Sequence, residues 1–128
     1  MRGFLAIMAL AGFCLAGAVL APAQETDESL KPGRQVFVEH CAQCHRTNGE
    51  GLPEKFPALN KNPFVVGDPN PVISTVLNGR KGQMGQMPYW KDKLNDEKIA
   101  AAITYIRNAW TNKAPGVSPE MVKALRGK

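Results

Sequence analysis

The chain has 128 residues, with 16 Lys and Arg against 11 Asp and Glu and a formal net charge of +5 at pH 7. This length fits one small domain and leaves little room for a second. The positive residues are scattered, and no basic stretch is interleaved with stacking aromatic residues, which disfavours nucleic-acid binding. A positive surplus on a small domain favours an acidic protein partner or an anionic surface.

The N-terminus has the pattern of a secretory signal peptide. Met1-Arg2 precede an apolar run from Phe4 to Leu20, and Ala21-Pro22-Ala23 form a small-residue cleavage site. A charged start, an apolar stretch and such a site together predict that residues 1–23 direct export and are then removed.

Cleavage would leave one domain, residues 24–128, with no membrane span and a periplasmic location. Because the apolar run is close to the lower length limit for a membrane helix, an uncleaved anchor is the alternative. Cys14 lies inside the run and would leave with it, so the mature chain keeps two cysteines.

We expect a first helix from about Pro32 into the stretch from Cys41 to Cys44, because proline suits the first turn of a helix. Residues 25–29 before it look like a flexible N-terminus. Three residues of this helix fall on one side, namely Val36, Phe37 and His40.

The sequence "CAQCH" places Cys41, Cys44 and His45 at the end of that helix. A zinc site would have to add His40, and four ligands within six consecutive residues are too cramped to surround one ion. A redox dithiol would need its cysteines at a helix N-terminus after a strand, which the sequence does not predict here. A structural disulfide suits an exported domain but does not explain the histidine.

A covalently attached haem explains every residue of this motif. Two cysteines one helical turn apart can form thioethers with the two vinyl groups, and the next residue can reach the iron. The sequence therefore favours a c-type haem held by Cys41, Cys44 and His45, with zinc, dithiol and disulfide as the alternatives.

The centre of the chain is poor in regular structure. Residues 46–70 hold four prolines and three glycines without strand-like alternation, and residues 78–90 are rich in glycine and methionine. A short helix is expected from about Pro71 to Leu77, closing at Asn78-Gly79. So long a loop in so small a domain makes sense if something other than protein fills the core.

The clearest helix lies near the C-terminus. Asn95 is a good N-cap, and Asp96 and Glu97 complement the helix dipole. Its apolar residues recur at spacings of four, three and four, namely Ile99, Ile103, Ile106 and Trp110. The stretch from 112 to 116 should end it, and "SPEMVKAL" could add a last helical turn.

These residues together resemble the class I c-type cytochromes over roughly residues 30–112. In that family a glycine and an aromatic residue precede the motif, as Gly33 and Phe37 do here. A proline carbonyl accepts a hydrogen bond from the haem histidine, which would be Pro57, and a Met-Pro pair, matched by Met87-Pro88, supplies the sixth ligand. A C-terminal helix crosses the first through an aromatic residue, matched by Tyr105.

The resemblance implies an all-α cytochrome c fold around one covalent haem c. Cys41 and Cys44 would bind the haem, and His45 and Met87 would be the axial ligands of its iron. Met84 is a near-repeat, but only Met87 precedes a proline, which biases its backbone toward an extended conformation. The C-terminal part is most similar to cytochrome modules of alcohol or sugar dehydrogenases and copper nitrite reductases.

The family further implies a periplasmic electron carrier rather than an enzyme, with no catalytic residues. It would move one electron between a dehydrogenase or quinol oxidoreductase and a terminal oxidase or reductase. The alternatives are a tightly held subunit of such a complex and a haem enzyme or gas sensor with an open iron site. Lys81, Lys91 and Lys93 flank the Met87 loop and could meet an acidic surface on a redox partner.

Four other side chains have both a functional and a plain interpretation. Arg80 and Trp90 could hydrogen-bond a haem propionate, or be a solvated arginine and a packing tryptophan. We interpret His40 as a surface histidine, because a residue directly before Cys41 has little freedom to reach the iron. Trp110 is interpreted as helix packing rather than a redox relay.

Overall fold

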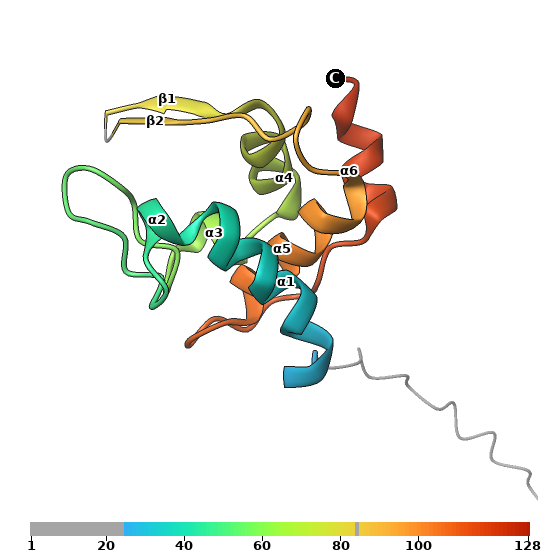
Figure 1. Ribbon diagram of the computed structural model, residues 1–128, viewed down its shortest axis with the longest axis horizontal. Helices are drawn as coiled ribbons and strands as arrows, with labels where there is room; N and C mark the ends of the chain where they lie inside the picture. The colour runs from blue at the N-terminus through green and yellow to red at the C-terminus, as the bar shows by residue number, and fades with distance from the viewer. Residues whose placement is uncertain (1–24, 84) are drawn as a thin grey trace, which may run out of the picture.

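The computed structural model describes residues 25–83 and 85–128. This part of the chain is mostly helical and carries one short antiparallel hairpin (Figure 1). In chain order the elements are α1 (Asp27–His40), α2 (Ala42–His45), α3 (Pro63–Val66), α4 (Pro69–Asn78), β1 (Arg80–Gly82), β2 (Gly85–Met87), α5 (Asp96–Asn108) and α6 (Pro119–Arg126). This agrees with the predicted all-α class.

The predicted signal peptide, residues 1–23, and the alternative of an uncleaved anchor lie outside the described residues. In the part of the chain that is described, none of the helices combines the length and the apolar character needed to cross a bilayer.

Helix α1 begins earlier than predicted. Its N-cap is Thr26, whose Oγ1 accepts a hydrogen bond from the Ser29 backbone at 3.2 Å, while Ser29 Oγ accepts from the Thr26 backbone at 2.9 Å. This reciprocal capping box satisfies two amides that would otherwise lack partners. The expectation of a flexible segment over residues 25–29 was therefore wrong, and Pro32 lies inside the helix rather than in its first turn.

The helix around the cysteines has a local break. Helix α1 ends at His40, and α2 follows after Cys41, whose φ of −117° departs from regular helical geometry. Helix α2 ends at His45, and its C-cap Arg46 has a positive φ of 63° that turns the chain away. The predicted helical placement of the motif is confirmed, with this break at its first cysteine.

The other helices differ from prediction mainly at their ends. Asn95 caps α5 as predicted, with Oδ1 accepting from the Lys98 backbone at 3.0 Å. The helix ends at Asn108, and Trp110 lies beyond it with a φ of +58°, so its predicted place on the helix was wrong. Helix α4 closes at Gly79, as predicted, where φ is +73°.

Helix α6 was expected as a last helical turn in "SPEMVKAL" and is longer, with 8 residues after its N-cap Ser118. The hairpin was not expected from the sequence. The hairpin pairs Arg80 with Met87, Lys81 with Gln86 and Gly82 with Gly85. Its strands are too short to give a readable alternation, which is why the sequence did not indicate them.

The core forms where α1 crosses α5. A Cβ at Gly33 would lie 2.0 Å from the Ala101 carbonyl oxygen and 2.8 Å from Tyr105 Cβ, so only glycine lets the helices approach this closely. One turn on, the rings of Phe37 and Tyr105 pack with centroids 5.4 Å apart. Both predicted family features, the glycine and the crossing through an aromatic pair, are confirmed.

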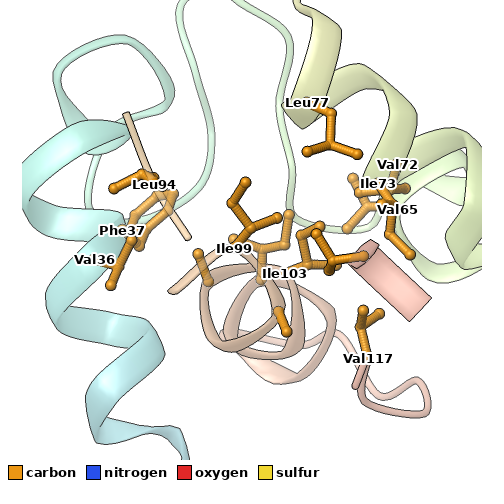
Figure 2. Close-up of a cluster of buried hydrophobic side chains, with 14 residues drawn as sticks. Val36, Phe37, Val65, Val72, Ile73, Leu77, Leu94, Ile99, Ile103 and Val117 are labelled. Atoms are coloured by element: carbon orange, nitrogen blue, oxygen red, sulfur yellow. The ribbon is translucent and has the colours of Figure 1, made fainter. Parts of the chain in front are cut away.

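Apolar side chains from five helices and two loops fill the rest of the core (Figure 2). They are Val36, Phe37, Val65, Val72, Ile73, Leu77, Leu94, Ile99, Ala100, Ala102, Ile103, Ile106, Val117 and Val122. Fully burying a large side chain of this kind stabilises a fold by about 1.5–3 kcal/mol.

A buried arginine ties three segments to α5. The Arg107 side chain is only 2% exposed. Its guanidinium donates to the carbonyls of Val65 at 2.7 Å, Gly67 at 2.9 Å and Pro115 at 2.8 Å. These bonds attach α3, the turn after it and the segment leading to α6 to the end of α5.

We predict that Gly33→Ala strongly destabilises the protein. Alanine in a helix interior is normally more favourable than glycine by about 1 kcal/mol. Here the added Cβ must push α1 away from the Ala101 carbonyl, and we expect a net loss of about 3 kcal/mol in the free energy of unfolding. Guanidinium denaturation measures this loss.

The control is Gly82→Ala, because a Cβ at Gly82 meets nothing within 4 Å. This exposed strand position should change the unfolding free energy by no more than about 0.5 kcal/mol. Equal effects at the two glycines would contradict the close helix crossing.

Candidate haem-binding site

The two motif cysteines lie half-buried at the α1–α2 junction and are not joined in a disulfide. Burial raises the pKa of Cys41 to about 11, and the nearby Cys44 adds to the rise. A redox dithiol needs a cysteine whose pKa is lowered, so that the thiolate can attack. The environment of Cys41 has the opposite effect, which disfavours the dithiol interpretation.

The imidazole of His45 is oriented by a backbone carbonyl. Its Nδ1 lies 3.0 Å from the Pro57 oxygen, the contact predicted from the family resemblance. A carbonyl can only accept, so Nδ1 carries the hydrogen and Nε2 keeps its lone pair. Burial lowers the pKa of His45, against the opposing effect of this hydrogen bond, and a lower pKa favours the neutral ring that binds metals.

The loop between α2 and α3 places the Pro57 carbonyl. Leu52 and Phe56 exchange backbone hydrogen bonds of 2.9 and 2.8 Å, and the Gly51 amide donates to the His45 carbonyl at 3.0 Å. Gly51 has a φ of +62°, and a Cβ there would lie 2.3 Å from the Phe56 oxygen and 2.6 Å from the Pro57 oxygen. The tight turn at this glycine therefore lets the carbonyl reach the histidine.

A second closure fixes the loop to the end of α5. The carbonyl of Gly49 accepts from the amides of Leu59 at 2.7 Å and Asn60 at 3.0 Å. The indole of Trp110 donates to the Thr47 carbonyl at 2.9 Å, and a Cβ at Gly49 would lie 2.6 Å from its ring. Trp110 thus packs beneath the loop after the motif, which supports its interpretation as a packing residue.

The hairpin that ends at Met87 approaches the same loop at its other end, at Gly85. Met87 is the last residue of β2 and is half-buried, whereas Met84 lies outside the described residues. At the other end of β2, a Cβ on Gly85 would lie 3.3 Å from the Lys55 carbonyl, so the hairpin approaches the loop that carries Pro57. The choice between the two methionines stays a prediction.

The residues after Met87 are aromatic and basic. The rings of Trp90 and His40 pack with centroids 5.3 Å apart. Lys93 Nζ lies over the Trp90 ring, 5.3 Å from the ring centroid. Arg80 lies over the ring of Phe64 at 5.4 Å. His40 therefore packs on a tryptophan at the edge of the core, and Arg80 forms a cation–π contact.

The donor set and its surroundings fit a covalent haem. Two thiols one turn apart and a histidine with a free Nε2 are the groups that c-type attachment needs. Cys41 of this donor set is partly buried and packs against the core, as do Ala42, Leu59, Val76 and Trp90. Within residues 25–83 and 85–128 no three His, Cys, Asp or Glu side chains converge as a metal-binding group, which leaves the zinc interpretation without ligands there.

Comparison with known proteins identifies the family. The model of the family described as "Cytochrome C oxidase, cbb3-type, subunit III" matches residues 28–106. Cytochrome c-552 of Thermus thermophilus is 34% identical over 113 residues, which cover 75% of this chain and 85% of that protein. The c-type cytochrome XoxG of Methylobacterium extorquens has a similar fold, with a TM-score of 0.52, 22% identity, and coverage of 77% of this chain and 65% of that one.

A dehydrogenase subunit is also similar. The cytochrome c subunit of a quinone alcohol dehydrogenase from Gluconacetobacter polyoxogenes is 34% identical over 93 residues, or 66% of this chain. Those residues are 20% of the subunit, so this chain spans about a fifth of that relative. The family match over more than half of the chain, together with the fold and the attachment motif, shows that this chain belongs to the class I c-type cytochromes and binds haem c covalently.

Proposed function

We propose that this protein is a one-electron carrier whose haem is bonded to Cys41 and Cys44 and ligated by His45 and Met87. The observation that carries the proposal is the His45 ring, oriented by Pro57 directly after the two cysteines. When bound, haem c supplies an iron that changes between the ferric and ferrous states by one electron.

Each side chain has a distinct role in this proposal. His45 binds through Nε2, while the hydrogen bond from Nδ1 to Pro57 fixes the ring and increases its basicity. The thioether of Met87 is a soft ligand that favours ferrous iron and so raises the reduction potential. With His45 and Met87 both bound to the iron, a substrate would have no access to it, and the protein would transfer electrons without catalysing a reaction of its own.

The physiological setting is part of the proposal. The predicted signal peptide supports export to the periplasm. There the protein would carry electrons between a dehydrogenase or quinol oxidoreductase and a terminal oxidase or reductase. The match to 85% of the length of cytochrome c-552 supports a carrier made of one cytochrome domain. The similarity to a dehydrogenase's cytochrome c subunit supports the second candidate, a subunit held in such a complex. Co-purification with a dehydrogenase at high salt would favour the subunit.

We predict that Gly51→Ala raises the reduction potential of the holoprotein. The added Cβ would displace the Pro57 carbonyl, and a weaker hydrogen bond makes His45 a poorer electron donor to ferric iron. The positive φ should also cost about 1–3 kcal/mol of unfolding free energy. Redox titration and denaturation measure the two effects. Gly127→Ala, where a Cβ meets nothing within 4 Å, is the control, and an unchanged potential in Gly51→Ala would argue against this role of the loop.

We predict that Met87→Ala opens the sixth coordination position. The ferric protein should lose its sulfur-to-iron absorption, and the ferrous protein should bind carbon monoxide. Met84→Ala should leave both properties nearly unchanged, because Met84 precedes a glycine and has no proline to direct its backbone. Optical spectra of the two variants decide the question. A reversed result would make Met84 the ligand, and two silent substitutions would refute His/Met ligation.

We predict that Lys91→Glu with Lys93→Glu slows electron transfer to the physiological partner. Both lysines are exposed on the segment after Met87, where a positive surface would attract an acidic partner. The association rate should fall by about tenfold or more at low ionic strength, and the difference should shrink as salt screens the charges. Lys61→Glu with Lys113→Glu changes the net charge equally elsewhere on the surface. Equal slowing by both pairs would show that net charge alone, not this face, controls docking.

A further inference from the structure

The segment that leads from Met87 to α5 is held by α4 on one side. The amide of Trp90 donates to the Val76 carbonyl at 3.1 Å, and the amide of Lys91 donates to the Leu77 carbonyl at 3.2 Å. These carbonyls lie in the last turn of α4, where helical carbonyls lack partners within the helix. The chain is thus fixed to a rigid element three and four residues after Met87.

Helix α6 holds the same segment from the other side through Arg126. Its Nη1 donates to the Lys91 carbonyl, its Nη2 to the Leu94 carbonyl at 3.0 Å, and its Nε to Asp96 Oδ1 at 2.7 Å. The side chains of this ion pair are only 27% and 22% exposed. All three guanidinium nitrogens are therefore used, in a planar fork that only arginine provides.

Arg126 is presented by a well-anchored helix. Val122 of α6 is fully buried, and Met121 and Leu125 pack against the core. Before α6, the hydroxyl of Thr104 accepts from the Val117 amide at 2.9 Å and donates to the Val117 carbonyl at 3.2 Å. In Figure 1 the chain between β2 and α5 passes beside the C-terminal half of α6. The arginine can therefore act as a fixed point for this segment.

The other end of the hairpin is fixed as well. Gly79, with a φ of +73°, starts the path from α4 to β1, and a Cβ there would lie 2.6 Å from the Met87 carbonyl and 2.9 Å from the Tyr89 amide. The backbone around Met87 thus packs directly on the end of α4. Loss of the Arg126 hydrogen bonds to the Lys91 and Leu94 carbonyls would leave the segment held from the α4 side. Met87 would then gain conformations that the two-sided arrangement excludes.

We infer that Arg126 is a positioning residue. It holds the segment that leads from Met87 to α5 and so keeps the Met87 sulfur on the haem iron. The inference rests on the proposed function, because it requires Met87 to be the sixth ligand. A methionine on a loosened loop leaves the iron more often, and an added ligand then competes better for the open position.

The test measures the affinity of the ferric holoprotein for imidazole, which can bind only when the methionine has left. Arg126→Gln removes the charge and the fork, and we expect imidazole to bind about tenfold more tightly than to the wild type. Arg126→Lys keeps the charge but cannot span three acceptors. Its imidazole affinity should lie between that of the wild type and that of Arg126→Gln. Met87→Ala is the reference for a fully open site and should bind most tightly.

Ala124→Gly controls for general weakening of α6. Ala124 is exposed in the same helix, and glycine there lowers helix stability while Arg126 itself is kept. Its imidazole affinity should stay within about twofold of the wild type. An increase equal to that of Arg126→Gln would overturn the inference, since any destabilisation of α6 would then suffice.

The remaining outcomes separate the two proposals. Wild-type affinity in Arg126→Gln, with tight binding in Met87→Ala, would refute the positioning role and leave the proposed function standing. Unchanged affinity in Met87→Ala would refute Met87 ligation itself. If Arg126→Gln does not fold, Arg126→Lys decides by the same comparison with Ala124→Gly.

Discussion

The crossing of α1 and α5 at Gly33 is the constraint on which the rest of the structure depends. Because a helix backbone lies where a Cβ would be, the direction of α1, and with it the position of Cys41 at its end, is set relative to α5. The chain leaving α5 then brings Trp110 under the loop after the motif, where it contacts Thr47 and Gly49. That loop orients the histidine. The geometry of the site therefore depends on how closely α1 and α5, which are far apart in the sequence, approach each other.

Local signals in the sequence predicted the parts of the fold that depend on local chemistry. Asn95 caps α5 through its own side chain, and Gly79 ends α4 with a positive φ, so neighbouring residues are enough to recognise both. The start of α1 depends on Thr26 and Ser29 together, a capping box in which serine takes the place usually filled by Glu or Gln. The apolar spacing predicted that Trp110 lies on α5, but the helix ends before it. Its indole instead donates a hydrogen bond to the Thr47 carbonyl in the loop after the motif.

The candidate site also contains features that the local sequence predicts and features that depend on the rest of the fold. The attachment motif and the partner of its histidine could be predicted, since Cys41, Cys44 and His45 lie within five consecutive residues and the family resemblance indicated Pro57. The supports of the site could not, because they act across the fold. Glycine at 51 is visible in the sequence, but its role appears only once the Pro57 carbonyl lies against it. Arg126 gave no signal at all, since its three acceptors are 30 to 35 positions away in the chain.

The buried guanidinium of Arg107 joins the C-terminal region to the rest of the domain through hydrogen bonds. Its acceptors belong to α3 on one side and to the segment before α6 on the other. If either segment opened alone, a buried cation would lose part of its hydrogen bonding while the other segment held it in place, at a cost of about 1–3 kcal/mol for each group left unpaired. The two segments therefore share one cooperative unit, and amide exchange in α3 should follow the opening of a stretch about 50 residues further along the chain.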